Sequence, residues 1–226
     1  MRFLNKLGWV CKGIFFSLLI TGVMAWPVFA KAVETSEQEV TMVEGFRSSQ
    51  FGMTEAEVIA AINKDFNLFE SDIRHHQNST EKTNGLSITI QDILPATGKA
   101  MVTYIFGYKT KKLIQVNILW GKPAETNPDP EKLVAAANSL RVYFARQGFQ
   151  KDDLMMNARL KDGSVLVFRG TDRNGRVVLL LLHNPQKPKE EDQEAEAATI
   201  ENLSLRLFYI SDPISPDIFQ IKSGDF

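Results

Sequence analysis

The amino-acid sequence predicts an α+β fold: one seven- to eight-stranded antiparallel sheet with both helices on one face. Two observations predict it. A stretch with apolar residues at helical spacing is followed by short stretches in which apolar and polar residues alternate, and this order then occurs a second time. The two helix-plus-antiparallel-meander units span residues 45–122 and 128–210. Because either unit alone would have a marginal core, one continuous sheet is favoured over two small domains joined through residues 121–128.

The first helix is predicted to begin at Thr54 and to reach Phe66. Thr54 and Glu57 have the spacing of a capping box, in which each residue accepts a hydrogen bond from the backbone N–H of the other. One apolar stripe follows at helical spacing, made of Val58, Ala61, Ile62 and Phe66. An amphipathic helix of this kind needs a second apolar surface to cover.

Strand-like stretches follow this helix. They are rich in β-branched and aromatic residues or alternate between apolar and polar side chains. The first is the weakest, and a turn with Pro95 and Gly98 separates the second from the third. The predicted strands are residues 72–78, 86–91, 101–107 and 113–120.

The second unit repeats this order. Asp129 is a predicted N-cap with Pro130 at the first helical position, and Gly148 is placed to end the helix. Asp162-Gly163 and Asn174-Gly175 lie between apolar stretches and predict tight hairpin turns. The strands predicted here are residues 154–160, 165–169, 176–183 and 203–209.

The first thirty residues have the pattern of a secretory signal peptide. Three basic residues precede an apolar run over residues 13–25, and Val28 and Ala30 are small residues at the cleavage positions. The alternative is an uncleaved anchor, but the run is shorter than the ~20 residues that span a bilayer. We therefore expect cleavage after Ala30, export to the bacterial periplasm, and no membrane span in the mature chain.

Segments outside the two units are polar. Residues 31–44 are expected to form a flexible arm, and residues 211–226 a tail. Within the second unit, residues 184–199 are acidic, contain proline and have no apolar face, so we expect a mobile surface insertion there.

Charge and cysteine content exclude several functions. Cleavage after Ala30 would leave 23 basic and 27 acidic residues, a formal charge of −4. Nucleic acid is not expected as a partner, because its binding domains carry a basic excess. The only cysteine, Cys11, lies before the apolar run, so the mature chain would have no lipid-bearing cysteine, no disulfide and no thiolate metal site.

A family resemblance rests on residues 51–58, Phe-Gly-Met-Thr-Glu-Ala-Glu-Val, placed after a signal peptide and before a meander. This pattern resembles small envelope proteins of the SmpA/OmlA type and the repeats of β-lactamase-inhibitor-like proteins, mainly over residues 51–62. The resemblance implies a non-enzymatic protein that acts by protein contact. The chain departs from the SmpA/OmlA pattern because it lacks the lipid-bearing cysteine. Residues 45–120 and 154–182 also resemble an uncharacterised periplasmic family, which implies no function.

No catalytic or metal-binding constellation is found in the sequence. Of the three histidines, His75 and His76 are neighbours in a predicted strand and should point to opposite faces, so they cannot easily bind one ion together. His183 ends a strand. The motifs HExxH, CxxC, GxSxG and GxGxxG do not occur. We therefore expect no catalytic residue, no metal and no cofactor, and hence no enzyme.

One hairpin tip is a candidate contact site. Residues 107–112 are predicted to form a turn that carries three lysines and an exposed tyrosine. These residues could contact an acidic partner or anionic headgroups, although simple solubility also explains them. The candidate partner-contact residues are Tyr108, Lys109, Lys111 and Lys112.

The expected function is that of a soluble periplasmic protein that binds another envelope protein or assembly through the exposed face or edge of its sheet. One alternative is a carrier of a small ligand, held between the helices and the sheet. A hydrolase of unrecognised type is the third hypothesis. It would require His75 or His76 in a cleft beside a carboxylate.

Overall fold

A computed structural model of the chain describes residues 41–184 and 203–221. They belong to a single compact unit, Gln38–Phe226. The expected signal peptide, most of the expected arm and nearly all of the acidic insertion lie outside the described residues.

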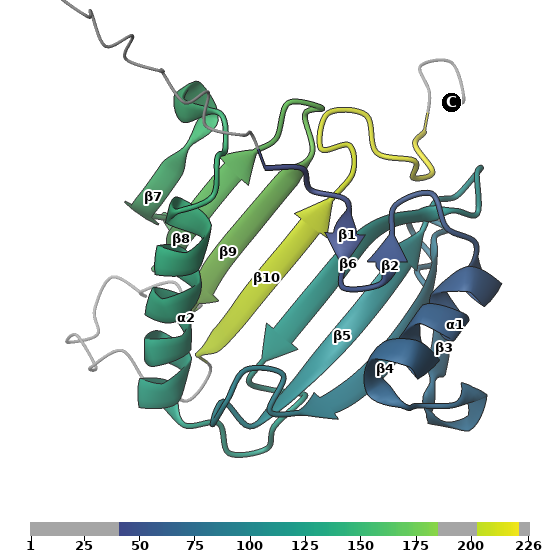
Figure 1. Cartoon of the computed structure of the whole chain (residues 1–226), viewed down its shortest axis with the longest axis horizontal. Helices are drawn as coiled ribbons and strands as arrows, with labels where there is room; N and C mark the ends of the chain where they lie inside the picture. Colours follow the sequence, from purple (N-terminus) through teal and green to yellow (C-terminus); the bar gives the residue numbers. More distant parts are fainter. Residues whose placement is uncertain (1–40, 185–202, 222–226) are drawn as a thin grey trace, which may run out of the picture. The chain divides into compact units, whose positions relative to one another are not determined.

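An eight-stranded antiparallel sheet forms most of this unit (Figure 1). Its order is β3-β4-β5-β6-β10-β9-β8-β7, and a separate two-stranded sheet pairs β1 with β2. The predicted α+β class with an antiparallel sheet is therefore confirmed. The strands are β1 (Gly45–Phe46), β2 (Ser49–Gln50), β3 (Arg74–Gln77), β4 (Asn84–Gln91), β5 (Lys99–Phe106), β6 (Leu113–Trp120), β7 (Met155–Arg159), β8 (Val165–Thr171), β9 (Val177–His183) and β10 (Ser204–Ile210).

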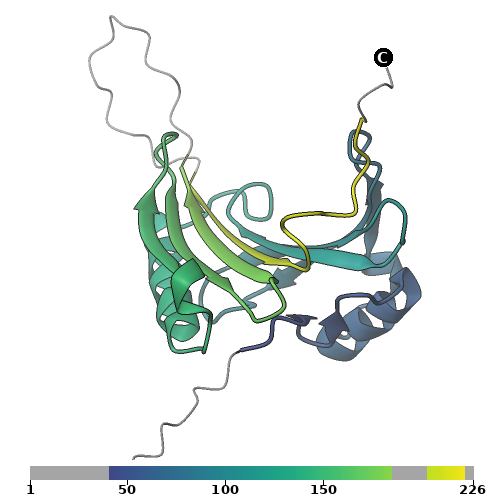
Figure 2. The same ribbon diagram turned by 90° about the horizontal axis from the view of Figure 1, so that it is seen from above.

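Strands β6 and β10 lie at the middle of the sheet and join its two halves. Trp120 pairs with Leu205, and Ile118 pairs with Leu207, in antiparallel register. One continuous sheet results, and Figure 2 shows that it is curved rather than flat.

Helix α1 (Glu55–Phe66) begins at the predicted capping box. The backbone N–H of Thr54 donates to Glu57 Oε2 at 2.7 Å, and the N–H of Glu57 donates to Thr54 Oγ1 at 3.4 Å. The helix ends at Asn67, which takes the left-handed conformation with φ 55°. The buried face is made of Val58, Ala61 and Ile62.

Helix α2 (Pro130–Ala145) packs against β8, β9 and β10. Asp129 Oδ1 accepts from the N–H of Glu131 at 3.0 Å, as the predicted N-cap requires. The sequence predicted that the helix ends at Gly148, whereas α2 ends at Ala145. Gly148 instead exchanges backbone and hydroxyl hydrogen bonds with Thr41.

The core lies between the buried sheet positions and the helices. Alternate residues of β5, β6 and β10 are buried, and each large apolar side chain contributes about 1.5–3 kcal/mol by leaving water. Two 3₁₀ turns, η1 (Glu70–Asp72) and η2 (Lys151–Asp153), precede β3 and β7. The largest buried side chains are Trp120, Tyr104, Phe106, Phe168, Ile62, Leu86, Ile88, Leu113, Ile118, Leu133, Leu180 and Leu205.

Residues 41–44 correct one expectation, because they are bound to the fold rather than loosely ordered. The N–H of Val43 donates to Asp172 Oδ2 at 2.9 Å, and Arg176 Nη1 donates to the Val43 carbonyl at 3.0 Å. The fully buried Asp172 also accepts from the N–H of Asn174. Apolar residues in a polar-looking arm can therefore still serve as part of the core.

Candidate functional site

One face of the sheet consists of residues in register with Arg206. Arg206 pairs with Leu119 on β6 and with Leu181 on β9, and Leu119 pairs in turn with Met101 on β5. Ser204 and Val177 of this face are buried, and its other residues on these strands are partly exposed, whereas the alternating set on the same strands is mostly buried. We call these partly exposed residues the Arg206 face: Met101, Thr103, Ile105, Gln115, Asn117, Leu119, Leu179, Leu181, Arg206, Phe208 and Ile210.

Apolar side chains dominate the Arg206 face. They come from four adjacent strands, β5, β6, β10 and β9, so they form one continuous surface. A contiguous exposed apolar surface with polar residues among it is typical of a protein or ligand contact site.

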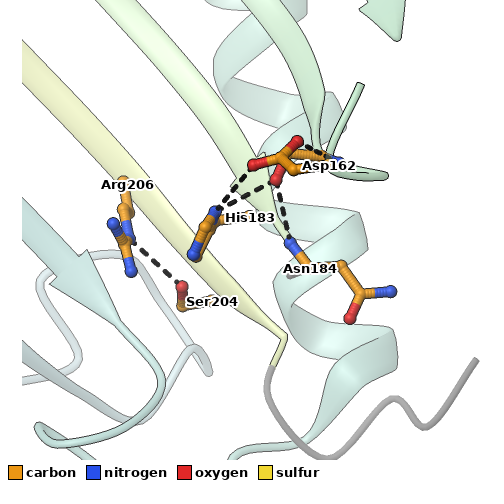
Figure 3. Close-up of polar contacts among 6 residues, drawn as sticks. Asp162, His183, Asn184, Ser204 and Arg206 are labelled. Carbon is orange, nitrogen blue, oxygen red and sulfur yellow. Dashed lines mark hydrogen bonds and ion pairs between the residues drawn. The ribbon is translucent and has the colours of Figure 1, made fainter. Parts of the chain in front are cut away.

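A polar cluster lies at one end of this face (Figure 3). His183 is the register partner of Ser204, and its Nδ1 lies 3.0 Å from Ser164 Oγ. Asp162 Oδ1 accepts from the N–H of Ser164 at 3.0 Å, and Asp162 Oδ2 lies 4.0 Å from the same His183 Nδ1. Helix α2 lies behind the sheet in this view, away from these side chains.

Burial and charge shape the titration of the cluster. Burial lowers the pKa of His183, the nearby positive charge of Arg206 lowers it further, and Asp162 acts in the opposite direction. The pKa of Asp162 is lowered chiefly by the backbone hydrogen bond from Ser164.

This Ser-His-Asp group lacks the geometry of a nucleophilic triad. A triad places the serine and the carboxylate on opposite ring nitrogens, so that the histidine can take the serine proton while the carboxylate orients it. Here Ser164 and Asp162 both approach Nδ1. Ser164 is also fully buried, and its Oγ accepts from the N–H of Asn184 at 3.3 Å. The group therefore ties the β7–β8 turn to the end of β9.

Arg206 has few polar neighbours. Its Nε donates to Ser204 Oγ at 3.3 Å, and no ion pair among residues 41–184 and 203–221 includes it. The side chains of its cross-strand neighbours, Leu119 and Leu181, cannot accept hydrogen bonds. Sequence reasoning missed Arg206, although a lone arginine inside the apolar stretch of the last strand was a usable signal.

The four predicted contact residues lie at the turn between β5 and β6. Tyr108 is only partly exposed, because its ring packs edge-on against Phe219 at 5.6 Å. Lys109, Lys111 and Lys112 are exposed. The structure thus brings the four together at one hairpin tip, beyond the end of the Arg206 face at Ile105 and Gln115.

The tip binds the chain's own C-terminal segment. Asp217 accepts from the N–H of Lys109 at 3.0 Å, from the N–H of Thr110 at 2.8 Å and from the Thr110 hydroxyl at 2.7 Å. Phe219 also lies under Lys82 Nζ, 4.2 Å from its ring centre. The described part of the expected tail is therefore docked on the hairpin.

His75 and His76 point to opposite faces of β3, as predicted. His75 pairs with the buried Leu86, and the ring of His76 lies against Gly85. His75 Nε2 is 2.7 Å from Glu70 Oε1, and its Nδ1 is 3.3 Å from Glu55 Oε1. All three side chains are well exposed, so this histidine lies beside carboxylates on an open surface.

Metal and membrane features are absent from the part of the chain that the structure describes. No group of three or more His, Cys, Asp or Glu side chains there could hold a metal ion. No helix in residues 41–184 or 203–221 combines the length and apolar character needed to cross a membrane.

A pocket of about 590 Å³ lies between α2 and the β4–β5 loop. Leu94 and Pro95 of the loop face Leu140 and Tyr143 of the helix across it. Its volume is in the range of small-molecule sites.

Comparisons with protein-family models, with curated proteins and with solved structures found no match. The resemblance to SmpA/OmlA-type and β-lactamase-inhibitor-like proteins therefore stays a prediction. The functional proposal for this chain therefore rests on its own surfaces.

Proposed function

We propose that this chain is a non-enzymatic periplasmic protein that binds another envelope protein or assembly through the Arg206 face. The observation that carries the proposal is the continuous set of partly exposed apolar residues across four strands. Soluble proteins rarely leave such a surface uncovered unless a partner binds it. The periplasmic location rests on the sequence pattern of residues 1–30.

The proposed arrangement places both helices on the face opposite Arg206, with each helix starting one of two repeated units. Figures 1 and 2 support it, since α1, α2 and the β1–β2 pair are drawn on one side of the sheet. The strand order also supports it, because β3–β6 and β7–β10 form separate halves. One face would then stay free for a partner.

The sheet edges are poorer contact sites than this face. Strand β7 is irregular at Asn157, which has φ 55° and is skipped in the register between Met156–Phe168 and Ala158–Leu166. Strand β3 has only four residues, all exposed and polar. Short or irregular edge strands resist pairing with another chain.

Site-specific photo-crosslinking in the native cells tests this proposal. A photoreactive residue at Leu119 or Leu181 should capture the same partner, because both positions flank Arg206. A matched control at exposed Lys64 on α1 should not capture it. Equal capture at all three positions, or no capture at Leu119 and Leu181, would contradict binding through this face.

The pocket beside α2 favours a second candidate function, carriage of a small apolar ligand. A fluorescent apolar probe such as N-phenyl-1-naphthylamine would report binding there. Replacing Ser139, an exposed residue of the pocket lining, by Trp should then abolish the signal, whereas Lys64→Trp should not. An unchanged signal in Ser139→Trp would remove this candidate.

A further inference from the structure

We propose that the partner segment bound by the Arg206 face carries a carboxylate flanked by apolar side chains, and that this carboxylate pairs with the Arg206 guanidinium. The inference rests on the proposed function, because it takes this face as the contact surface. It adds the chemistry that the partner must supply.

Charge is segregated in the sheet. The chain has 27 acidic residues, yet none of them lies in strands β3–β10, all of which are described. Acidic side chains of the described part lie in helices, turns and connecting segments instead. The sheet thus presents only positive charge: its charged strand residues are Arg74, Lys99, Arg159, Arg169 and Arg206.

Arg206 is the positive charge nearest the middle of the sheet. It lies on β10, which pairs with β6 and β9, whereas Arg74 is on the edge strand β3. Arg169 is on the same face, but its Nη1 donates to the carbonyl of Asp153 at 3.2 Å, toward η2. In the described residues, Ser204 is the only side chain that accepts from the Arg206 guanidinium, and it accepts from Nε. The other guanidinium N–H donors have no side-chain acceptor there.

Covering the apolar neighbours would remove water from these donors. A partner that packs on Leu119 and Leu181 must also cover Arg206, because the three are adjacent in one cross-strand row. A charged group that loses water without gaining an acceptor opposes binding strongly. A carboxylate restores the lost interactions best, since its two oxygens match the planar fork of the guanidinium.

Among residues 41–184 and 203–221, neighbouring charges do not already satisfy this requirement. Asp162 is the carboxylate of the nearby cluster, and it accepts from Ser164 and lies beside His183 rather than Arg206. Burial and the charge of Arg206 itself lower the pKa of His183, which favours its neutral form. The position for a partner acid is therefore beside Arg206, between the two leucines.

Selection from a displayed library of random peptides tests the proposal without knowledge of the natural partner. Peptides selected on the unmodified protein should place Asp or Glu between apolar residues. Selection on Arg206→Gln should still return apolar peptides but without acidic enrichment. Arg169→Gln is the matched control, since it removes one arginine from the same face and should keep the enrichment.

The best selected peptide then gives a quantitative test. Changing its acidic residue to the amide should weaken binding about tenfold or more on the unmodified protein and leave Arg206→Gln unaffected. Equal weakening on both proteins would overturn the carboxylate–Arg206 pair. Leu119→Ser and Leu181→Ser should abolish binding of these peptides, and retained binding would instead overturn the proposed contact face. Thermal unfolding checks that each variant is folded.

Other occupants give distinct outcomes. Anionic phosphatidylglycerol vesicles that bind the protein, but not Arg206→Gln, would assign the face to a lipid surface. A dimer in sedimentation equilibrium that Leu119→Ser dissociates would assign it to a second copy. Each of these results would overturn the proposal.

Discussion

The β5–β6 hairpin tip and the Arg206 face are both positively charged, yet they differ in what surrounds the charge. At the tip, the backbone donors of Lys109 and Thr110 are already bound by Asp217, and the lysine side chains extend into water. On the face, Arg206 lies between Leu119 and Leu181 with only Ser204 as a side-chain acceptor in the described residues. Two basic surfaces of one chain can therefore differ in whether their donors already have acceptors among the described residues.

Reversing the charge on the face should have the largest effect. Arg206→Glu would remove the donors and repel a partner carboxylate, so binding of an acidic selected peptide should fall by about 100-fold, or roughly 2.7 kcal/mol. Calorimetric titration measures it. Binding unchanged within about threefold would show that Arg206 contributes little.

Breaking the tip should affect stability rather than binding. Asp217→Ala removes the acceptor for three donors and should lower the free energy of unfolding by about 1–3 kcal/mol. Urea denaturation followed by circular dichroism measures this. Asp212→Ala, which loses only local turn bonds, is the control. A loss of peptide binding in Asp217→Ala alone would mean that the two regions are coupled.

Acid should weaken the fold at the edge of the Arg206 face. The pKa of His183 is lowered by burial and by Arg206, so the unfolded chain binds its proton more readily. The stability from neutral His183 is complete above its ordinary pKa of 6.5 and falls as pH drops through its lower folded value. Unfolding measured between pH 8 and pH 5 should show this slope, and His183→Asn should reduce it. An equal slope in the variant would show that protonation of another group causes the pH dependence.

Removing charge from the tip should have the smallest effect on binding. Lys109→Gln combined with Lys111→Gln leaves the Asp217 contacts in place, because these use backbone N–H groups. Affinity for the selected peptides should change by less than about twofold at physiological salt. A large drop in this affinity would show that the hairpin tip contributes to peptide binding.

Local patterns predicted much of the fold. Thr54 and Glu57 specify the start of α1, and Asp129 specifies the start of α2, because capping involves residues only two or three positions apart. The Asn174-Gly175 turn was likewise found from its residues, with Gly175 at φ 78°. Period-two alternation, strand-favouring composition and flanking turns predicted the strands, because these are properties of each stretch alone.

Contacts between distant residues were not predicted. Gly148 was expected to end α2, but it pairs with Thr41, 107 residues away. The docking of the tail was not predicted either: Asp217 binds Thr110, which is also 107 residues distant. Neither local spacing nor composition carries information about such pairs.

The helix starts, the strands and most of their buried faces follow from the order of residues alone, because each depends on neighbouring residues and on burial of apolar side chains. Which cations of the described residues already have acceptors there depends instead on the three-dimensional arrangement of the strands and the C-terminal segment. Pairing of β10 with β6 and β9 places Arg206 between Leu119 and Leu181, and docking of the C-terminal segment occupies the tip. The physical reason is that solvation of a charge depends on its neighbours in space, which the order of residues along the chain does not specify.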